Sequence, residues 1–390
     1  MKDKLVIIGA NEFQNQLILK AKERNIETHV FAWQDGSIGE STADYFYPIS
    51  IVEKEQILAK AKEINPSGII SIASDLAVIT VNYVAKELNL FGNSLESTVV
   101  STNKFEMRKA FEKNNVPSPK FICVDKDTDL SKLNVEYPVI IKPTDRSGSR
   151  GINKIFSFDE MQGAVDAAID VSFSKKALIE EFAEGREFSI EYISQNGKHN
   201  FLAVTEKFTT GAPHFIETGH MQPARITKEQ EDHIKEIIPR ALDALGIKNS
   251  ASHSELKIDS NGNIKIIEIG ARMGGDCIGS DLVKISTGYD FVSMVIDVAM
   301  GKKLEMKKVC EPKVALVKFI FSMDDYKLLQ KIKDNNPDKI YRISDVEDIG
   351  SRQVTDSSTR FGYFILQCDS QEEGLSLLGM SGKQYEKCKK

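Results

Sequence analysis

Short apolar runs alternate with amphipathic helical patterns along the N-terminal part of the chain. Strands are expected at 5–8, 28–32 and 68–72, and helices at 11–24, 53–64 and 75–88. Alternation of strands and helices at this spacing indicates a parallel sheet with helices on both faces. We therefore predict an N-terminal Rossmann-like α/β domain.

The first strand-to-helix turn of this domain indicates what the domain does not bind. Residues 9–14 read Gly-Ala-Asn-Glu-Phe-Gln, which lacks the GxGxxG spacing that brings a backbone close to a pyrophosphate. The chain has no GxxxxGK[ST] phosphate-binding loop either. The domain is therefore interpreted as a platform for a substrate and not as a dinucleotide site.

The pattern changes at residues 116–119, Val-Pro-Ser-Pro, where the prolines break any helix. A small α+β unit follows, with strands at 139–142, 152–156 and 177–181 and a helix at 158–171. The predicted organisation is α/β and α+β multidomain. Its parts are an α/β substrate platform at 1–116, a lid unit at 117–185, a catalytic core at 186–308 and a small C-terminal α/β domain at 309–390.

Composition excludes several classes of protein. The net charge of −6, with scattered Lys and Arg, gives no indication of nucleic-acid binding. No apolar segment has the length of a membrane span. The five cysteines are far apart and form no CxxC pair, which argues against a disulfide framework and a zinc site and favours a reducing cytoplasm.

The strongest local signal is a predicted hairpin. The runs at 253–259 and 264–270 flank an Asn261-Gly262 pair, a frequent hairpin turn. A turn centred there places Glu255 directly opposite Glu268, with Cβ atoms roughly 4.5–5.5 Å apart, where like charges repel. A divalent cation removes that repulsion, and carboxylate oxygens suit magnesium. The alternative is that both side chains reach solvent at a sheet edge.

Cationic residues occur at further informative positions. Arg272 follows the second strand of the hairpin, and its planar fork suits phosphate or carboxylate; an ion pair with Asp276 or Glu268 is the alternative. Lys142 ends a buried strand, and Lys104 opens a helix, where anions are favoured. With the glycine- and serine-rich loop at 147–151 they suggest a phosphate clamp, although solvent-facing lysines and a mobile surface loop would share this composition.

An apolar strand delivers carboxylates at Glu180 and Glu181, continues through Phe182 and resumes at Glu187. Such a linker between subdomains could hold adenine and ribose. An acidic surface loop is the alternative interpretation of this segment.

These motifs, in this order, resemble the ATP-grasp superfamily. The matching segments lie between about Lys104 and Gly301: YPVIIKP at 137–143, SGSRG at 147–151, IEEFAEGREFS at 179–189, HSELK at 253–257 and IEIGARMGG at 267–275. The resemblance implies an ATP-grasp fold with a preceding Rossmann-like domain. It also implies ATP and Mg²⁺, or Mn²⁺, as cofactors.

The resemblance also implies roles for individual residues. Lys104 and Lys142 would bind phosphates, aided by Ser147, Gly148, Ser149 and Gly151. Glu180, Glu181 and Phe182 would meet the adenine, and Glu187 the ribose. Glu255 and Glu268 would hold the metal, and Arg272, Lys142 and Arg150 would be catalytic.

One position departs from the superfamily pattern. The pattern after the second metal carboxylate is Glu-x-Asn-x-Arg, and Gly270 stands at the Asn position. One metal ligand or phosphate contact is therefore missing, and the number of metal ions is left open.

Within the superfamily the chain looks most like carboxylate–amine ligases of the amino-acid ligase type. The expected activity is amide or peptide bond formation through an acyl phosphate, with small-molecule carboxylate and amine substrates and a homodimer as one possible assembly. His214 and His220 are candidates for the acceptor site, or residues of a surface strand and loop. A purine-pathway ligase acting on a phosphoribosylamine and a non-catalytic ATP-binding sensor are the alternatives.

Overall fold

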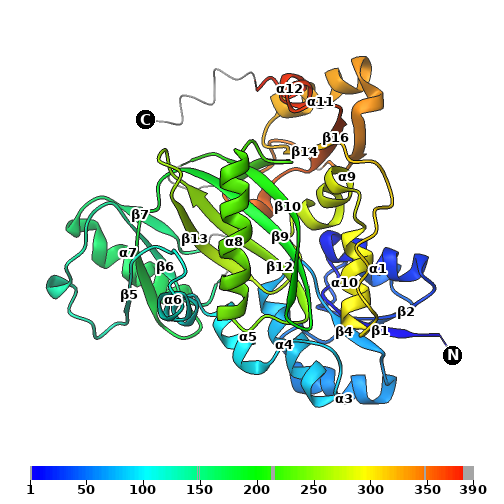
Figure 1. The fold of residues 1–390 in the computed structure, drawn as a ribbon, viewed down its shortest axis with the longest axis horizontal. Coiled ribbons are helices and arrows are strands. Elements are labelled where there is room, and N and C mark those ends of the chain that lie inside the picture. The colour runs from blue at the N-terminus through cyan, green and yellow to red at the C-terminus, as the bar shows by residue number, and fades with distance from the viewer. Residues whose placement is uncertain (1, 147, 149, 212–215, 347, 381–390) are drawn as a thin grey trace.

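The computed structural model describes residues 2–146, 148, 150–211, 216–346 and 348–380. The described chain contains two four-stranded sheets and one eight-stranded sheet. In Figure 1 the small lid unit lies at the left, the N-terminal unit at the lower right and the last helices at the top. No described helix combines the length and the hydropathy needed to cross a membrane.

The N-terminal sheet is parallel, as predicted, with strand order β3-β2-β1-β4. Its strands are β1 (Lys4–Ile8), β2 (Glu27–Phe31), β3 (Tyr45–Tyr47) and β4 (Gly68–Ile70). Its helices are α1 (Glu12–Glu23), α2 (Ile38–Thr42), α3 (Lys54–Ile64) and α4 (Asp75–Glu87). A side-chain cap begins α4. The hydroxyl of Ser74 accepts a hydrogen bond from the backbone amide of Ala77.

Two further helices, α5 (Leu95–Thr102) and α6 (Lys104–Lys113), lead into the lid unit. The side chain of Asn103 accepts the amides of Phe105 and Glu106, so Lys104 opens α6 as predicted. The lid unit is an antiparallel sheet of order β5-β8-β6-β7 with one helix. Its elements are β5 (Phe121–Val124), β6 (Val139–Pro143), β7 (Asn153–Ile155), α7 (Met161–Val171) and β8 (Ala177–Glu181).

The large sheet has strand order β13-β12-β9-β10-β11-β14-β16-β15. Its strands are β9 (Arg186–Gln195), β10 (Lys198–Thr209), β11 (Glu217–Gln222), β12 (Ser250–Ile258), β13 (Ile264–Gly270), β14 (Val314–Phe319), β15 (Ile340–Ile343) and β16 (Tyr363–Cys368). Its associated helices are α8 (Lys228–Ala244), α9 (Val283–Thr287), α10 (Phe291–Ala299), α11 (Met323–Asn335) and α12 (Gln371–Leu377), with a π-helical turn at Ile278–Leu282.

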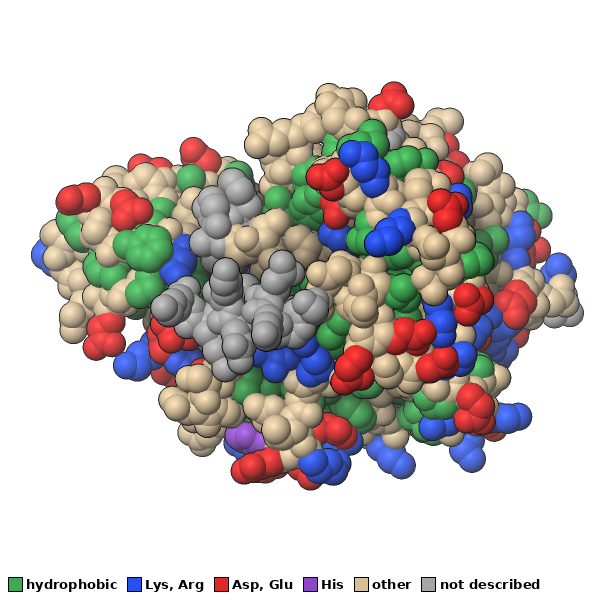
Figure 2. All heavy atoms as spheres, turned by 90° about the horizontal axis from the view of Figure 1, so that it is seen from above, with side chains coloured by type: hydrophobic (Ala, Val, Ile, Leu, Met, Phe, Trp, Pro, Cys, Tyr) green, Lys and Arg blue, Asp and Glu red, His purple; other side chains and the backbone are tan. Residues whose placement is uncertain are grey.

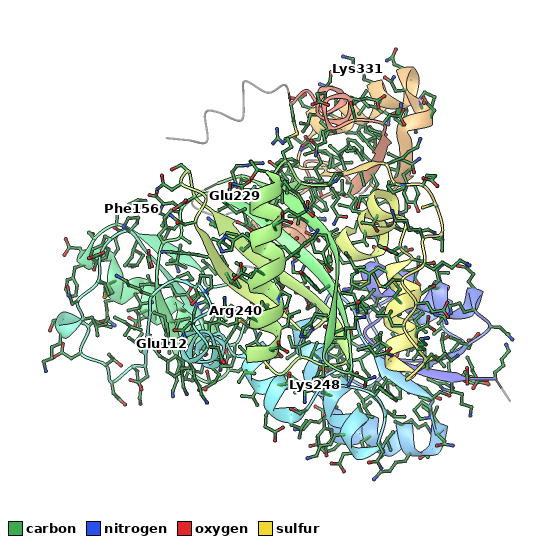
Figure 3. All side chains as sticks on the ribbon, viewed as in Figure 1. Glu112, Phe156, Glu229, Arg240, Lys248 and Lys331 are labelled. Atoms are coloured by element: carbon green, nitrogen blue, oxygen red, sulfur yellow. The ribbon has the colours of Figure 1, made fainter. Side chains whose placement is uncertain are left out.

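Helix α8 lies across one face of this sheet (Figure 1). Its residues Ile234, Ile238 and Leu242 are buried in one cluster with Phe188 and Leu256 of the sheet. Glu229 and Arg240, labelled in Figure 3, lie on the exposed side of the same helix. The opposite face also has an apolar part, because Ile193 and Ala251 of the sheet are buried in another cluster with Val295 of α10.

The predicted fold class is confirmed, and one feature of its organisation was not expected. Strands β14, β15 and β16 continue the sheet of β9 to β13, so the segment from 309 onward has no sheet of its own among the described residues. The division into four domains stays a prediction. On the face in Figure 2, acidic and basic side chains are interspersed.

Candidate active site

A cleft of about 210 Å³ lies where the lid unit, the large sheet and the start of α4 meet. It is lined by most of the predicted site residues: Lys104, Lys142, Gly148, Glu180, Glu181, Phe182, Glu187, Glu255, Glu268 and Arg272.

The hairpin of β12 and β13 places Glu255 directly opposite Glu268, as the turn argument predicted. The register beside the turn differs from the predicted one by one residue, because Ile258 pairs with Ile264. A β-bulge between Glu255 and Leu256 shifts the register and brings the two carboxylates level. The bulged residue Ile267 offers its carbonyl to buried Arg108 at 2.6 Å.

Each of the two carboxylates has a lysine partner. Lys104 donates to Glu268 at 2.7 Å, and Lys207 donates to Glu255 at 2.8 Å. The expected repulsion between the carboxylates is therefore offset by cations of the chain itself. Burial favours protonation of Glu255, but Lys207 and His253 hold the pKa of that carboxyl well below its usual value.

Lys207 is a buried cation that the sequence interpretation missed. Its ammonium lies 2.9 Å from Glu187, 2.8 Å from Glu255 and 3.6 Å from Glu217. Burial lowers the pKa of Lys207, but these three carboxylates raise it well above its usual value. Glu187, the predicted ribose contact, and Glu255, a predicted metal ligand, thus share one ammonium group.

Lys142 and Glu180 form a buried pair at 2.6 Å, and Arg108 lies 2.7 Å from the other oxygen of Glu180. Burial raises the pKa of Glu180, but the two cations lower it below its usual value. Burial lowers the pKa of Lys142, against the effect of Glu180. Glu180 is buried and each of its oxygens already faces a cation, which restricts what it can offer to an adenine.

The rest of the predicted adenine wall, Glu181 and Phe182, lies at the end of β8 in the lid unit. Glu181 pairs with Lys265 and accepts the amide of Lys120 at 3.2 Å. The ammonium of Lys154 lies 3.4 Å from the centre of the Phe182 ring. Phe182 lines the cleft, and its ring already carries a cation on one face.

The phosphate loop is only partly described. Ser147 and Ser149 lie outside the described residues. Gly148 lines the cleft, and Gly151 has a φ of +70° with Val171 2.7 Å from the position of a Cβ, so no side chain fits there. Arg150 is exposed. Arg146, which the sequence interpretation missed, lines the cleft and lies over the Phe173 ring at 4.5 Å.

Arg272 reaches a carboxylate that no motif indicated. Its Nε and Nη2 donate to Asp75 at 2.9 and 3.0 Å, and Asp75 is the first residue of α4 in the N-terminal unit. The predicted alternatives for Arg272 were Asp276 and Glu268. Asp276 instead accepts two hydrogen bonds from Arg360, at 3.0 and 2.7 Å.

His253 and Glu191 complete the buried part of the site. They form a close ion pair, and Glu191 also accepts the amide of Gly274 at 3.0 Å. Burial lowers the pKa of His253, but the charge and hydrogen bond of Glu191 raise it to about 9. Alternation along β12 could have indicated His253, because it precedes Glu255 by two residues and shares its face.

Of the two candidate acceptor histidines, the structure describes only His220. His214 lies outside the described residues. His220 is buried on β11, 3.8 Å from Asp276, and within the described part of the chain neither ring nitrogen has a hydrogen-bond partner. Burial lowers the pKa of His220 below its usual value.

The oxygen ligands of the carboxylate pair, Glu255 and Glu268, are of the type that a hard divalent cation prefers. Two carboxylates on adjacent strands supply oxygen ligands, and Mg²⁺ commonly keeps several waters or phosphate oxygens as its others. No group of three or more His, Cys, Asp or Glu side chains suited to a metal occurs among the described residues. A metal here would therefore rely on Glu255 and Glu268, with Lys104 and Lys207 giving way.

The chain is similar to several known proteins. Residues 135–281 match the family model for an ATP-grasp domain. The chain is 25% identical over 309 residues to alanine–anticapsin ligase of Bacillus subtilis (strain 168), which covers 70% of this chain and 65% of that ligase. The match thus spans slightly less than two thirds of that relative.

Two solved structures have a similar fold over nearly the whole chain. The L-amino acid ligase from Bacillus licheniformis superposes with a TM-score of 0.82 at 22% identity, covering 100% of this chain and 97% of that one. Phosphoribosylglycinamide synthetase from Anaerococcus prevotii superposes with a TM-score of 0.78 at 21% identity, covering 97% of both chains.

Proposed function

The chain belongs to the ATP-grasp superfamily, and from that premise we propose that it is an ATP-dependent carboxylate–amine ligase. One observation carries the proposal. The opposed carboxylates Glu255 and Glu268 line the same cleft as the cations Lys104, Lys142 and Arg272. This arrangement suits a polyphosphate bound with a divalent cation, next to a cation that can hold a second anion.

The proposed reaction has two steps. A carboxylate oxygen of the first substrate attacks the γ-phosphorus of ATP, and the bond to ADP breaks, which leaves an acyl phosphate. The amine of the second substrate then attacks the acyl carbon, phosphate leaves and the amine gives up a proton. When bound, Mg²⁺ would neutralise charge on the phosphate oxygens.

The chain's own residues would position the reactants. Lys104 and Lys142 would hold phosphate oxygens, for which each would exchange a carboxylate partner. Arg272 would present donors to the acyl phosphate. Most of the rate enhancement in this scheme comes from positioning and charge neutralisation.

Amino acids are the proposed substrates, because the L-amino acid ligase and alanine–anticapsin ligase are among the similar proteins. The similarity to phosphoribosylglycinamide synthetase supports a phosphoribosylamine as the second candidate acceptor. A binding protein without turnover is the remaining alternative.

The test is phosphate release from ATP with the purified chain and Mg²⁺, screened against pools of amino acids and, separately, phosphoribosylamines. Phosphate and ADP in equal amounts, dependent on an amino-acid pool, are expected. Release of AMP and pyrophosphate would contradict the acyl phosphate route. ATP binding without release in either pool would favour the binding protein.

A further inference from the structure

The space beside Gly270 is already filled. Gly270 follows Glu268 by two residues on β13, and a Cβ there would lie 2.5 Å from Oδ1 of Asp75 and 3.2 Å from Cζ of Arg272. Its backbone is not in the left-handed region. Glycine is therefore needed at this position for space and not for a special φ.

Asp75 comes to this place from another part of the fold. It opens α4, and the amide of Ala73 just before it donates to the carbonyl of Met273 at 3.1 Å. The N-terminal unit is thus joined to the loop that carries Arg272 by a backbone hydrogen bond and by the Asp75–Arg272 pair.

The pairing fixes the orientation of the guanidinium. Asp75 receives Nε and Nη2, which are two donors on one side of the planar fork. The remaining N–H groups of Nη1 and Nη2 point away from Asp75. Nη1 makes a long and weak contact, 3.5 Å, with the carbonyl of Met273. Donors of the guanidinium therefore stay available to an anion in the cleft.

We propose that Asp75 is the positioning residue for Arg272. Gly270 and Asp75 also form a compensating pair: the carboxylate of Asp75, from the N-terminal unit, occupies the space that a side chain at position 270 would fill. The catalytic part of this inference rests on the proposed function, because it requires Arg272 to hold an anion. The steric part does not.

The steric part is tested by a double-variant cycle on unfolding. Gly270→Asn is expected to lower the unfolding temperature of the nucleotide-free chain, because a side chain at this position clashes with Asp75. Adding Asp75→Ala to Gly270→Asn should restore much of the lost unfolding temperature. Gly163→Asn is the control, since nothing lies within 4 Å of a Cβ at Gly163.

A Gly270→Asn chain as stable as the parent would overturn the pairing. So would a double variant that is no more stable than Gly270→Asn alone. Neither result depends on turnover, so the steric part is decided even if the ligase assay finds no activity.

The positioning role is tested by calorimetry with inorganic phosphate in the presence of saturating MgADP. Asp75→Asn keeps the shape of the side chain and removes its charge. It should weaken phosphate binding about tenfold, in line with loss of a charge-assisted hydrogen bond, and leave MgADP affinity unchanged. Arg272→Ala is the comparison and should weaken phosphate at least as much.

Phosphate affinity that is unchanged or higher in Asp75→Asn would contradict positioning. A higher affinity would mean that Asp75 competes with the anion for Arg272. Failure of the parent chain to bind MgADP at all would instead count against the proposed function.

Discussion

At the scale of single residues, the carboxylate of Glu180 on β8 links two other elements, β6 and α6. Lys142 of the lid sheet and Arg108 of α6 both lie against its carboxylate, and all three side chains are buried. Removing one partner of such a cluster leaves a buried charge, which is costly. A variant that keeps Arg108 in place should isolate the part that Lys142 plays in nucleotide binding.

Lys142→Met is expected to weaken ATP binding about tenfold or more, because a charge-assisted hydrogen bond contributes about 1.5–3 kcal/mol. The chain should still fold, since Glu180 retains Arg108 at 2.7 Å. Titration calorimetry measures the affinity. Lys132→Met, in the same unit with its side chain 80% exposed, is the control and should bind ATP as the parent does. Equal affinities in the two variants would make Lys142 purely structural.

The His253–Glu191 pair should make stability depend on pH. The pKa of His253 is raised to about 9 in the folded chain, above its usual value of about 6.5. The folded state then binds one more proton than the unfolded state between these values. The free energy of unfolding should fall as pH rises through this window, by up to about 1.4 kcal/mol per pH unit.

Urea unfolding of the parent and of His253→Gln/Glu191→Gln at pH 6 to 10 measures this slope. The double variant removes both charges and keeps a partner for the Gly274 amide. Its slope should be shallower than that of the parent in this window. Parallel slopes would show that His253 is not a buried imidazolium.

At the scale of the elements, the hairpin shows what the sequence could and could not predict. The Asn261-Gly262 turn identified the pair Glu255 and Glu268 correctly. The predicted register near the turn was wrong by one residue, and the bulge at Ile267 compensates. The bulge carbonyl is held by Arg108, which lies 159 residues away, so no local pattern could have revealed it.

The same limit applies to the partners of the site. Local motifs identified residues that line the cleft, such as Lys104, Lys142 and Arg272. They missed Asp75 and Lys207, which belong to a helix start and a strand without a recognisable motif. Ion pairs between distant segments depend on tertiary packing, which periodicity does not encode.

The hairpin also predicts a difference between its two carboxylates. Glu268→Gln takes away the carboxylate partner of Lys104, whereas Glu255→Gln leaves Lys207 with Glu187 and Glu217. Without nucleotide, Glu268→Gln should therefore destabilise the chain more, by about 1 kcal/mol or more. With magnesium and ADP, both variants should lose most of the thermal stabilisation that the parent gains, because an amide is a poorer ligand for a hard cation.

Thermal unfolding of both variants, with and without magnesium and ADP, measures these effects. If a variant keeps the full magnesium-dependent stabilisation, the substituted carboxylate is not a metal ligand. That result for Glu268→Gln would remove Glu268 from the proposed metal site.

At the scale of the whole molecule, the large sheet connects the catalytic core to the C-terminal segment. Strand β14 pairs with β11 from Gly219 to Gln222 and with β16 on its other side. Met221 of β11 is buried in one cluster with Leu316 of β14 and Phe364 of β16. Arg360 also reaches Asp276, in the loop that follows Arg272.

A chain ending at residue 308 should therefore fail to fold as a stable monomer. It would lose the partner strand of β11, expose an unpaired edge and uncover Met221, which together favour aggregation. Soluble yield and size-exclusion chromatography measure the outcome, with urea unfolding of any soluble material. A chain ending at 380 keeps every described strand and is the control. If the 308-residue chain is a stable monomer that binds MgADP like the parent, the C-terminal segment is an independent domain and β11 tolerates being an edge.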